Sequence, residues 1–180
     1  MASPVYEHKK DTKKKINFSI ILISDTRYNE FKEGKASSDK SLGLIQKILE
    51  ENNHKIIKYI IIPDEISKIS AAVNELLAND SIDMIITTGG TGISPRDVTV
   101  EAIMPLLDKK IEGFGEIFRY LSYIEIGSAA MLSRAFAGVI KQKIIYCLPG
   151  SPNACKLALE KLILKESGHA LKMIGKKREN

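Results

Sequence analysis

The sequence predicts an α/β protein, a three-layer α/β/α sandwich built on a mixed, mostly parallel sheet. Short β-rich apolar runs alternate along the chain with longer stripes of helical period, which is typical of that class. The unbroken apolar run Met84–Ile86 indicates a parallel strand that helices cover on both faces. At 180 residues the chain can bury one sizeable core, and no repeat or linker divides it.

The first half of the chain predicts three strands, each followed by a segment with its own pattern. The strands are Ile16–Ser24, Lys55–Ile62 and Asp83–Thr88. Apolar residues at helical spacing predict a helix after each of the first two strands, with one stripe at Leu42, Ile45, Ile48 and Leu49 and the next at Ile66, Ile69, Val73, Leu76 and Leu77. Pro63 ends the second strand, because proline cannot donate to a sheet.

The second half predicts helices first and then a pair of strands. Val98–Tyr123 is interpreted as two helices, separated by a turn at the glycine-containing segment Glu112–Gly115. The remaining elements are a helical turn at Ala129–Arg134, strands at Phe136–Ile140 and Ile144–Leu148, and helices at Ala154–Leu164 and His169–Ile174. We expect one domain over residues 16–174.

The net charge of +5 lies at the two ends of the chain. Removing the nine basic and three acidic side chains of residues 1–15 and 172–180 leaves 18 basic and 19 acidic ones between them. No basic face is therefore expected that could follow a phosphate backbone, which argues against a nucleic-acid partner. The segments 1–15 and 175–180 are expected to be solvated basic tails, with polyanion binding as the alternative.

Composition also limits the setting of the protein. No apolar run has the length that spans a membrane, and the basic start lacks the apolar core of a signal peptide. The two cysteines, Cys147 and Cys155, lack metal-site spacing, and no histidine lies in a ligand motif. We expect buried, reduced cysteines, no membrane partner and a cytoplasmic location.

The segment after the third strand is the strongest candidate for chemistry. Thr87–Asp97 contains three glycines, which let the backbone approach an anion closely, and a helix whose N-terminus attracts negative charge is expected to follow. The segment lacks the Gly-Lys-Ser/Thr of a Walker A loop and the Rossmann glycine spacing. It predicts a cradle for phosphate or carboxylate, with a plain glycine turn as the weaker alternative.

Two carboxylates stand at neighbouring strand ends. Asp97 closes the glycine segment and Asp64 follows the second strand, and each could simply cap the next helix. Ligands of open α/β sheets bind beyond the carboxyl ends of the strands, so the two side chains are expected near the cradle. Together they form a plausible Mg²⁺ site for nucleotide chemistry.

The other strand ends offer weaker signals. In Leu148–Ala154, Ser151 is expected to cap the next helix, with Pro152 in its first turn. Asp25 ends the first strand, and Asp39 and Ser41 open its helix; each alone is a cap or turn residue.

Four separated motifs together resemble the MoaB/Mog family of molybdenum cofactor biosynthesis. They are TTGGTG-x-x-x-RD-x-T-x-EA at residues 87–102, GFGE at 113–116, AxLSR at 130–134 and LPGSP at 148–152. Their order and spacing make the match specific, and it covers residues 16 to about 174. Thr91 and Arg96 favour this family over the CinA-like proteins, which share a similar domain. One departure is Leu42 between Ser41 and Gly43, where the family often reads Asp-Lys-Ser-Gly.

The resemblance implies an Mg²⁺-dependent transfer of AMP from ATP to the terminal phosphate of molybdopterin, with release of pyrophosphate. It implies catalytic roles for Asp64, Asp97 and Ser133, with Asp64 and Asp97 binding or positioning Mg²⁺. The nucleotide and its phosphates would be bound by Thr88, Gly89, Gly90, Thr91, Gly92, Arg96, Pro149, Gly150 and Ser151. The pterin side would be formed by Glu116, Ser133 and Arg134, with a subunit contact as the alternative for Glu116.

The resemblance further implies a homotrimer or homohexamer and other proteins of the cofactor pathway as partners. An apolar segment around Phe114, Phe118 and Tyr120, too apolar for a helix that faces water, also predicts a homo-oligomer. The alternative to an enzyme is a catalytically silent protein that binds molybdopterin or acts as a scaffold.

Overall fold

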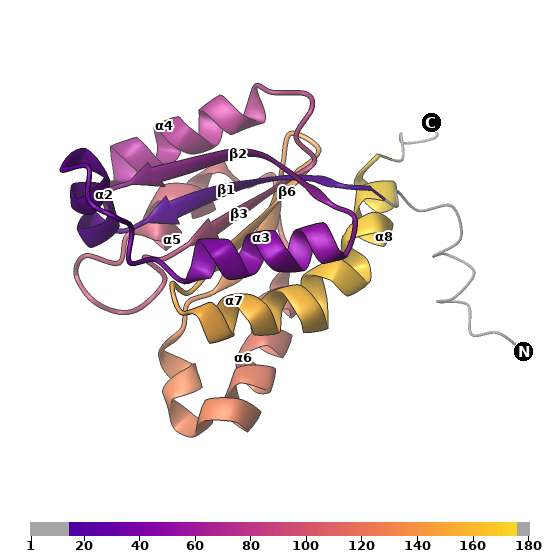
Figure 1. The fold of residues 1–180 in the computed structure, drawn as a ribbon. Helices are drawn as coiled ribbons and strands as arrows, with labels where there is room; N and C mark the ends of the chain where they lie inside the picture. The colour runs from indigo at the N-terminus through magenta and orange to yellow at the C-terminus, as the bar shows by residue number, and fades with distance from the viewer. Residues whose placement is uncertain (1–14, 176–180) are drawn as a thin grey trace, which may run out of the picture.

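The computed structural model describes residues 15–175. It shows a six-stranded sheet in the order β2–β1–β3–β6–β5–β4 (Figure 1). The strands are β1 (Asn17–Ile23), β2 (Lys55–Ile62), β3 (Met84–Thr88), β4 (Lys109–Lys110), β5 (Phe136–Ile140) and β6 (Lys143–Leu148). The strands β1, β2, β3 and β6 run parallel to one another. At the other edge, β5 pairs antiparallel with β6, and β4 pairs antiparallel with β5. The predicted mixed, mostly parallel sheet is confirmed.

Helices cover both faces of the sheet. They are α2 (Asp25–Lys32), α3 (Ser41–Glu51), α4 (Ile66–Leu77), α5 (Thr99–Ile103), α6 (Glu112–Ile126), α7 (Pro152–Ala158) and α8 (Leu164–Ile174). Short 3₁₀ turns lie at η1 (Met104–Leu106) and η2 (Gly127–Leu132), and a π-helical turn, η3 (Leu159–Ile163), joins α7 to α8. The sheet face with α3, α6, α7 and η3 forms one core cluster, and the face with α4 and α5 forms the other. The predicted three layers are present.

The central strands supply both clusters. In β1, Phe18 and Ile20 belong to the cluster on the α3 side, whereas Ile21 and Ile23 belong to the cluster on the α4 side. Every residue of β3 is buried, as its unbroken apolar pattern predicts. Burial on both faces leaves β1 and β3 no polar alternation, because neither face meets water.

The predicted turn at Glu112–Gly115 is wrong, since these residues form the first turn of α6. The physical reason is packing. A Cβ on Gly115 would lie 2.8 Å from the carbonyl oxygen of Ala135, so the glycine permits close contact with the chain before β5. The sequence also did not predict α2, which buries no residue and so shows no apolar stripe, or the two-residue strand β4.

The apolar segment of α6 is divided between core and surface. Phe114 and Phe118 are buried in the core of the protein, 7% and 1% exposed, so they do not form part of an apolar surface from which a homo-oligomer could be predicted. Tyr120 is 65% exposed. It belongs to a larger exposed set, here called the α6–η2 surface: Ile117, Tyr120, Tyr123, Ile124, Ile126, Met131 and Leu132. In Figure 1, α6 and the following turn extend away from the sheet. Among residues 15–175, no helix has the length and apolarity needed to cross a membrane.

Candidate active site

The loops that follow the parallel strands meet at one edge of the sheet. The arrowheads of β1 and β2 point toward this edge, where α2 lies (Figure 1). A cavity of about 320 Å³ opens there, lined by Leu22, Ile23, Ser24, Arg27, Asp39, Asp64, Gly89, Gly90, Asp97 and Gly150. The structure therefore brings together five residues predicted for the site, from the loops after β2, β3 and β6.

The glycine loop has the backbone that an anion cradle needs. Gly89 and Gly90 have φ angles of +107° and +64°, which residues other than glycine rarely adopt. A Cβ on Gly89 would collide with the carbonyl of Ile23. Among the described residues, the N–H groups of Gly90, Thr91 and Gly92 have no hydrogen-bond acceptor, although Thr91 is 2% exposed. Three successive unpaired N–H groups are suited to bind phosphate oxygens.

Arg134 holds this loop in place. Its Nε donates to the carbonyl oxygen of Gly92 at 2.7 Å, its Nη2 donates to that of Asp97 at 2.7 Å, and its backbone N–H donates to Thr91 at 2.8 Å. An ion pair with Glu101 balances its charge and, through this hydrogen bond, lowers the pKa of Glu101. The guanidinium is thus engaged with the cradle and with α5.

Asp97 does not cap the helix that follows it. The residue at the N-cap of α5 is Val98, and no side chain caps that helix. The Oδ2 of Asp97 instead accepts the N–H of Ser94 at 2.8 Å and closes the end of the glycine loop. Oδ1 accepts no hydrogen bond from residues 15–175 and remains available to a ligand.

Asp64 does not cap its helix either, because Glu65 occupies the N-cap of α4. Its Oδ2 accepts the backbone N–H of Asp25 at 2.9 Å, and its own N–H donates to Oδ1 of Asp25 at 3.1 Å. Burial raises the pKa of Asp64, and the charges of Asp25 and Asp97 raise it further, while the Asp25 N–H and Arg96 lower it. A cation in the cavity would relieve this accumulation of negative charge.

These two carboxylates fit an Mg²⁺ site that phosphate completes. Each has one oxygen fixed by a backbone N–H, and both side chains line the same cavity. Within the described residues, no group of three or more acidic, histidine or cysteine side chains could hold a metal on its own. Mg²⁺ is commonly bound by one or two carboxylates together with substrate phosphates, so this donor set suits it.

The segment after β6 also contributes to the site. Ser151 accepts the N–H of Ala154 at 3.2 Å and caps α7, with Pro152 in the first turn, as the sequence predicts. Gly150 lines the cavity, and its carbonyl accepts the hydroxyl of Ser41 at 2.8 Å. The hydroxyl of Thr88, 1% exposed, donates to the carbonyl oxygen of Pro149 at 3.1 Å and so ties the start of the glycine loop to the segment after β6.

Both cysteines are buried, as expected. Burial raises the pKa of Cys155 to about 11 and that of Cys147 to about 12. Thiols with such pKa values stay protonated at neutral pH and are poor nucleophiles.

The three residues predicted for the pterin side do not line this cavity. Glu116 is exposed on α6, and the Oγ of Ser133 accepts the N–H of Ala135 at 3.3 Å. Arg134 lines a neighbouring cavity of about 200 Å³ that also contains Gly115 and Arg119. Since Arg134 also binds the carbonyl of Asp97, it connects the two cavities.

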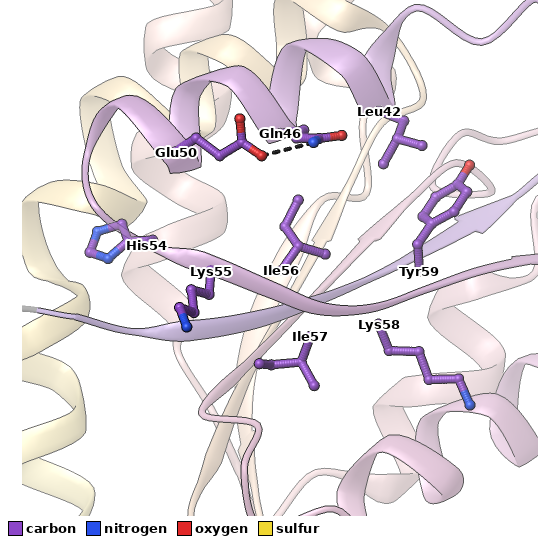
Figure 2. A pocket seen from close by; sticks show the side chains of 9 residues that line it. All are labelled: Leu42, Gln46, Glu50, His54, Lys55, Ile56, Ile57, Lys58 and Tyr59. Carbon is purple, nitrogen blue, oxygen red and sulfur yellow. Dashed lines mark hydrogen bonds between the residues drawn. The ribbon is translucent and has the colours of Figure 1, made fainter.

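A cavity of about 540 Å³ lies elsewhere, where α3 faces the edge strand β2 (Figure 2). Figure 2 shows Ile56 and Tyr59 pointing toward α3, whereas Ile57 and Lys58 point away from it. Ile57 is the extra residue of a β-bulge, and Lys58 forms an ion pair with Glu75. A bulge and an edge lysine are devices that discourage strand addition, so we interpret this groove as a protected edge without chemistry.

Comparison with known proteins identifies the family of this chain. Residues 19–169 match the family model MoCF_biosynth, described as a probable molybdopterin binding domain. The chain belongs to this family. It is 48% identical to molybdenum cofactor biosynthesis protein B of Bacillus cereus over 166 residues, which cover 92% of this chain and 94% of that protein. It is 49% identical over 158 residues to a probable molybdopterin adenylyltransferase of Methanocaldococcus jannaschii, covering 88% and 93% of the two chains.

Solved structures of the family have the same fold. A crystal structure of a molybdenum cofactor biosynthesis protein B matches with a TM-score of 0.82 and 46% identity, over 89% of this chain and 96% of that one. The tungsten cofactor synthesizing protein MoaB from Pyrococcus furiosus matches with a TM-score of 0.78 and 39% identity, over 91% and 99%. The MoaB/Mog resemblance is confirmed.

In this family member, the sequence-based prediction missed the residues that follow β1. Ser24 and Arg27 line the cavity, and Ser24 caps α2 by accepting the N–H of Arg27 at 3.4 Å. Asp39, which accepts the N–H of Ser41 at 2.9 Å, also lines it. These residues could have been found from their position, because they follow the first parallel strand, and the same rule selected the residues after the other strands.

Proposed function

We propose that this protein is a molybdopterin adenylyltransferase that transfers AMP from ATP to the terminal phosphate of molybdopterin. A phosphate oxygen of molybdopterin forms a bond to the α-phosphorus of ATP while the bond to the bridging oxygen breaks, and pyrophosphate leaves. One observation carries the proposal: Asp64, Asp97 and Gly90 line one cavity, and Gly90 begins a run of three unpaired N–H groups in the glycine loop. Its relative from M. jannaschii is named for the same activity.

Within this proposal the chain positions and neutralises phosphates. The N–H groups of the glycine loop bind phosphate oxygens, and Arg27 and Arg96 supply positive charge from α2 and from the end of that loop. Gly150 and Ser151 border the nucleotide, while the hydrogen bond between Thr88 and Pro149 stabilises the glycine loop. Phosphoryl transfer depends mainly on such positioning and electrostatic stabilisation.

Asp64 and Asp97 would hold Mg²⁺, each through the oxygen that no backbone N–H occupies. Mg²⁺ held by these two residues would supply positive charge beside the phosphates and so stabilise the departure of pyrophosphate. The raised pKa of Asp64 supports this assignment, because a half-buried carboxylate with acidic neighbours is stabilised by a bound cation.

Molybdopterin would approach from the side of Glu116, Ser133 and Arg134. The support is the neighbouring 200 Å³ cavity, which contains Arg119 and Arg134 and adjoins the loop that ends at Asp97. Ser133 would act at the phosphate that receives AMP, which requires its hydroxyl to face the ligand.

The deciding experiment measures pyrophosphate release with purified protein, ATP, Mg²⁺ and molybdopterin. We expect release only when all three are present, and none after chelation of Mg²⁺. Saturable binding of molybdopterin without any turnover would refute the enzyme and support the alternative of a silent binding or scaffold protein.

We also propose a homo-oligomer, a trimer or hexamer, that buries the α6–η2 surface. Five of its seven residues are more than 60% exposed, and large exposed apolar patches are uncommon on monomers. A cytoplasmic location and partners from the molybdenum cofactor pathway stay predictions. The predicted tails lie almost wholly outside the described residues, so the domain limits of 16 and 174 also stay predictions.

A further inference from the structure

We propose that Asp25 is a positioning residue of this site, which orients the Asp64 carboxylate and holds Arg96 beside the glycine loop. The inference rests on the proposed binding of ATP. Asp25 is the first residue of α2 and does not line the cavity, so it is not expected to touch substrate.

Asp25 connects the loops that follow three parallel strands. It lies directly after β1, it exchanges two hydrogen bonds with Asp64 after β2, and its Oδ2 accepts Nε of Arg96 at 3.0 Å. Nη2 of Arg96 binds the same oxygen as part of an ion pair. The partners are 39 and 71 residues away in the sequence, so this junction exists only in the folded chain.

The two contacts have different consequences. The Asp64 carboxylate accepts the backbone N–H of residue 25, and this bond survives any substitution of the Asp25 side chain except proline. The N–H of Asp64 donates to Oδ1 of Asp25, a bond that the amide oxygen of asparagine can also accept. The bond to Arg96 depends on the Asp25 carboxylate. The side chain of Arg96 is 63% exposed, and within residues 15–175 its guanidinium has no other hydrogen-bond acceptor.

Without Asp25, the Arg96 side chain would sample many rotamers in water. The carboxylate removes this freedom before a ligand arrives, which favours phosphate binding by pre-organisation. It takes two donors of the guanidinium and leaves Nη1 for a phosphate oxygen. Arg96 should therefore contribute fully to nucleotide binding only while the Asp25 side chain holds it in place.

A double-mutant cycle tests this dependence. The probe is MgATP, titrated by calorimetry without molybdopterin so that no turnover occurs. In the parent protein, Arg96→Gln should weaken MgATP binding about tenfold, the effect of one charge-assisted hydrogen bond. In the Asp25→Asn background, the same substitution should weaken binding by about twofold or less, since Arg96 is already released. General effects of charge on the triphosphate cancel in the cycle.

Asp108→Asn supplies the matched control. Asp108 also accepts a backbone N–H, from Lys141 at 2.7 Å, but it lies by the antiparallel strands β4 and β5. In that background Arg96→Gln should keep its full tenfold effect. If Asp25→Asn does not fold, Asp25→Ser replaces it as a second neutral side chain with the same expectation.

Equal losses for Arg96→Gln in the parent and in the Asp25→Asn background would overturn the positioning role and leave the proposed function intact. An Arg96→Gln variant that binds MgATP like the parent would overturn it as well. A parent protein that binds no MgATP would overturn both proposals.

Discussion

Replacing Asp97 by asparagine separates the stability of the glycine loop from its chemistry. The Asp97 Oδ2 accepts the Ser94 N–H at 2.8 Å, and the amide oxygen of asparagine can make the same bond. The loss is then only the charge assistance, about 1 kcal/mol or less. For a chain of this size that corresponds to a fall in Tm of about 2–4 °C at most.

The effect on catalysis should be much larger. With its oxygen held by Ser94, the asparagine directs an NH₂ group toward the cavity, and that group donates hydrogen bonds and cannot bind Mg²⁺. Removing such a group typically lowers the rate by ~10²-fold or more. The assay is pyrophosphate release at saturating ATP and molybdopterin, beside thermal unfolding without ligands. Asp108→Asn is the control, with a similar change in Tm and the parent rate. If Asp97→Asn turns over at the parent rate, Asp97 only shapes the loop and the proposed Mg²⁺ site is wrong.

Three further predictions concern the cradle, the half-buried His54 and the apolar surface. Gly89→Ala should abolish MgATP binding in calorimetry, because Gly89 has a φ of +107° and an added Cβ would collide with Ile23. The control is Gly150→Ala, whose Cβ would lie 3.5 Å from the Gly89 Cα and which should weaken binding less than about threefold. Equal effects of the two substitutions would contradict the cradle. Burial lowers the pKa of His54 below its ordinary value of 6.5, so as the pH falls the unfolded chain is protonated at this residue before the folded chain is. Unfolding scans should therefore show that the parent loses more stability between pH 7 and pH 5 than His54→Gln does. Equal losses in the two proteins would show that the pKa of His54 is not lowered by folding. Tyr120→Glu should dissociate the homo-oligomer in light scattering at micromolar concentration, and an unchanged mass, or a parent that is already monomeric, would exclude this surface as the interface.

The sequence by itself determined the layers and the place of the site. Apolar stripes at helical spacing and unbroken β-rich runs are local patterns, and they located β2 at its observed bounds and the apolar stripe of α4. The rule that ligands bind beyond the carboxyl ends of parallel strands then selected Asp64, Asp97 and the glycine loop. All three meet at the same cavity.

Only the tertiary structure decided what each side chain does there. Asp64 and Asp97 could equally have been helix caps, and the deciding hydrogen bonds to Asp25 and Ser94 depend on how the loops fold. Arg96 is held by Asp25, and Arg134 by carbonyls of the glycine loop 37 and 42 residues away. Gly113 and Gly115 look like a turn in sequence, but both lie in α6, and Gly115 serves close packing in the fold. Periodicity reports only which way a residue faces within its own element, whereas hydrogen bonds between distant loops arise when the strands assemble and bring their ends together.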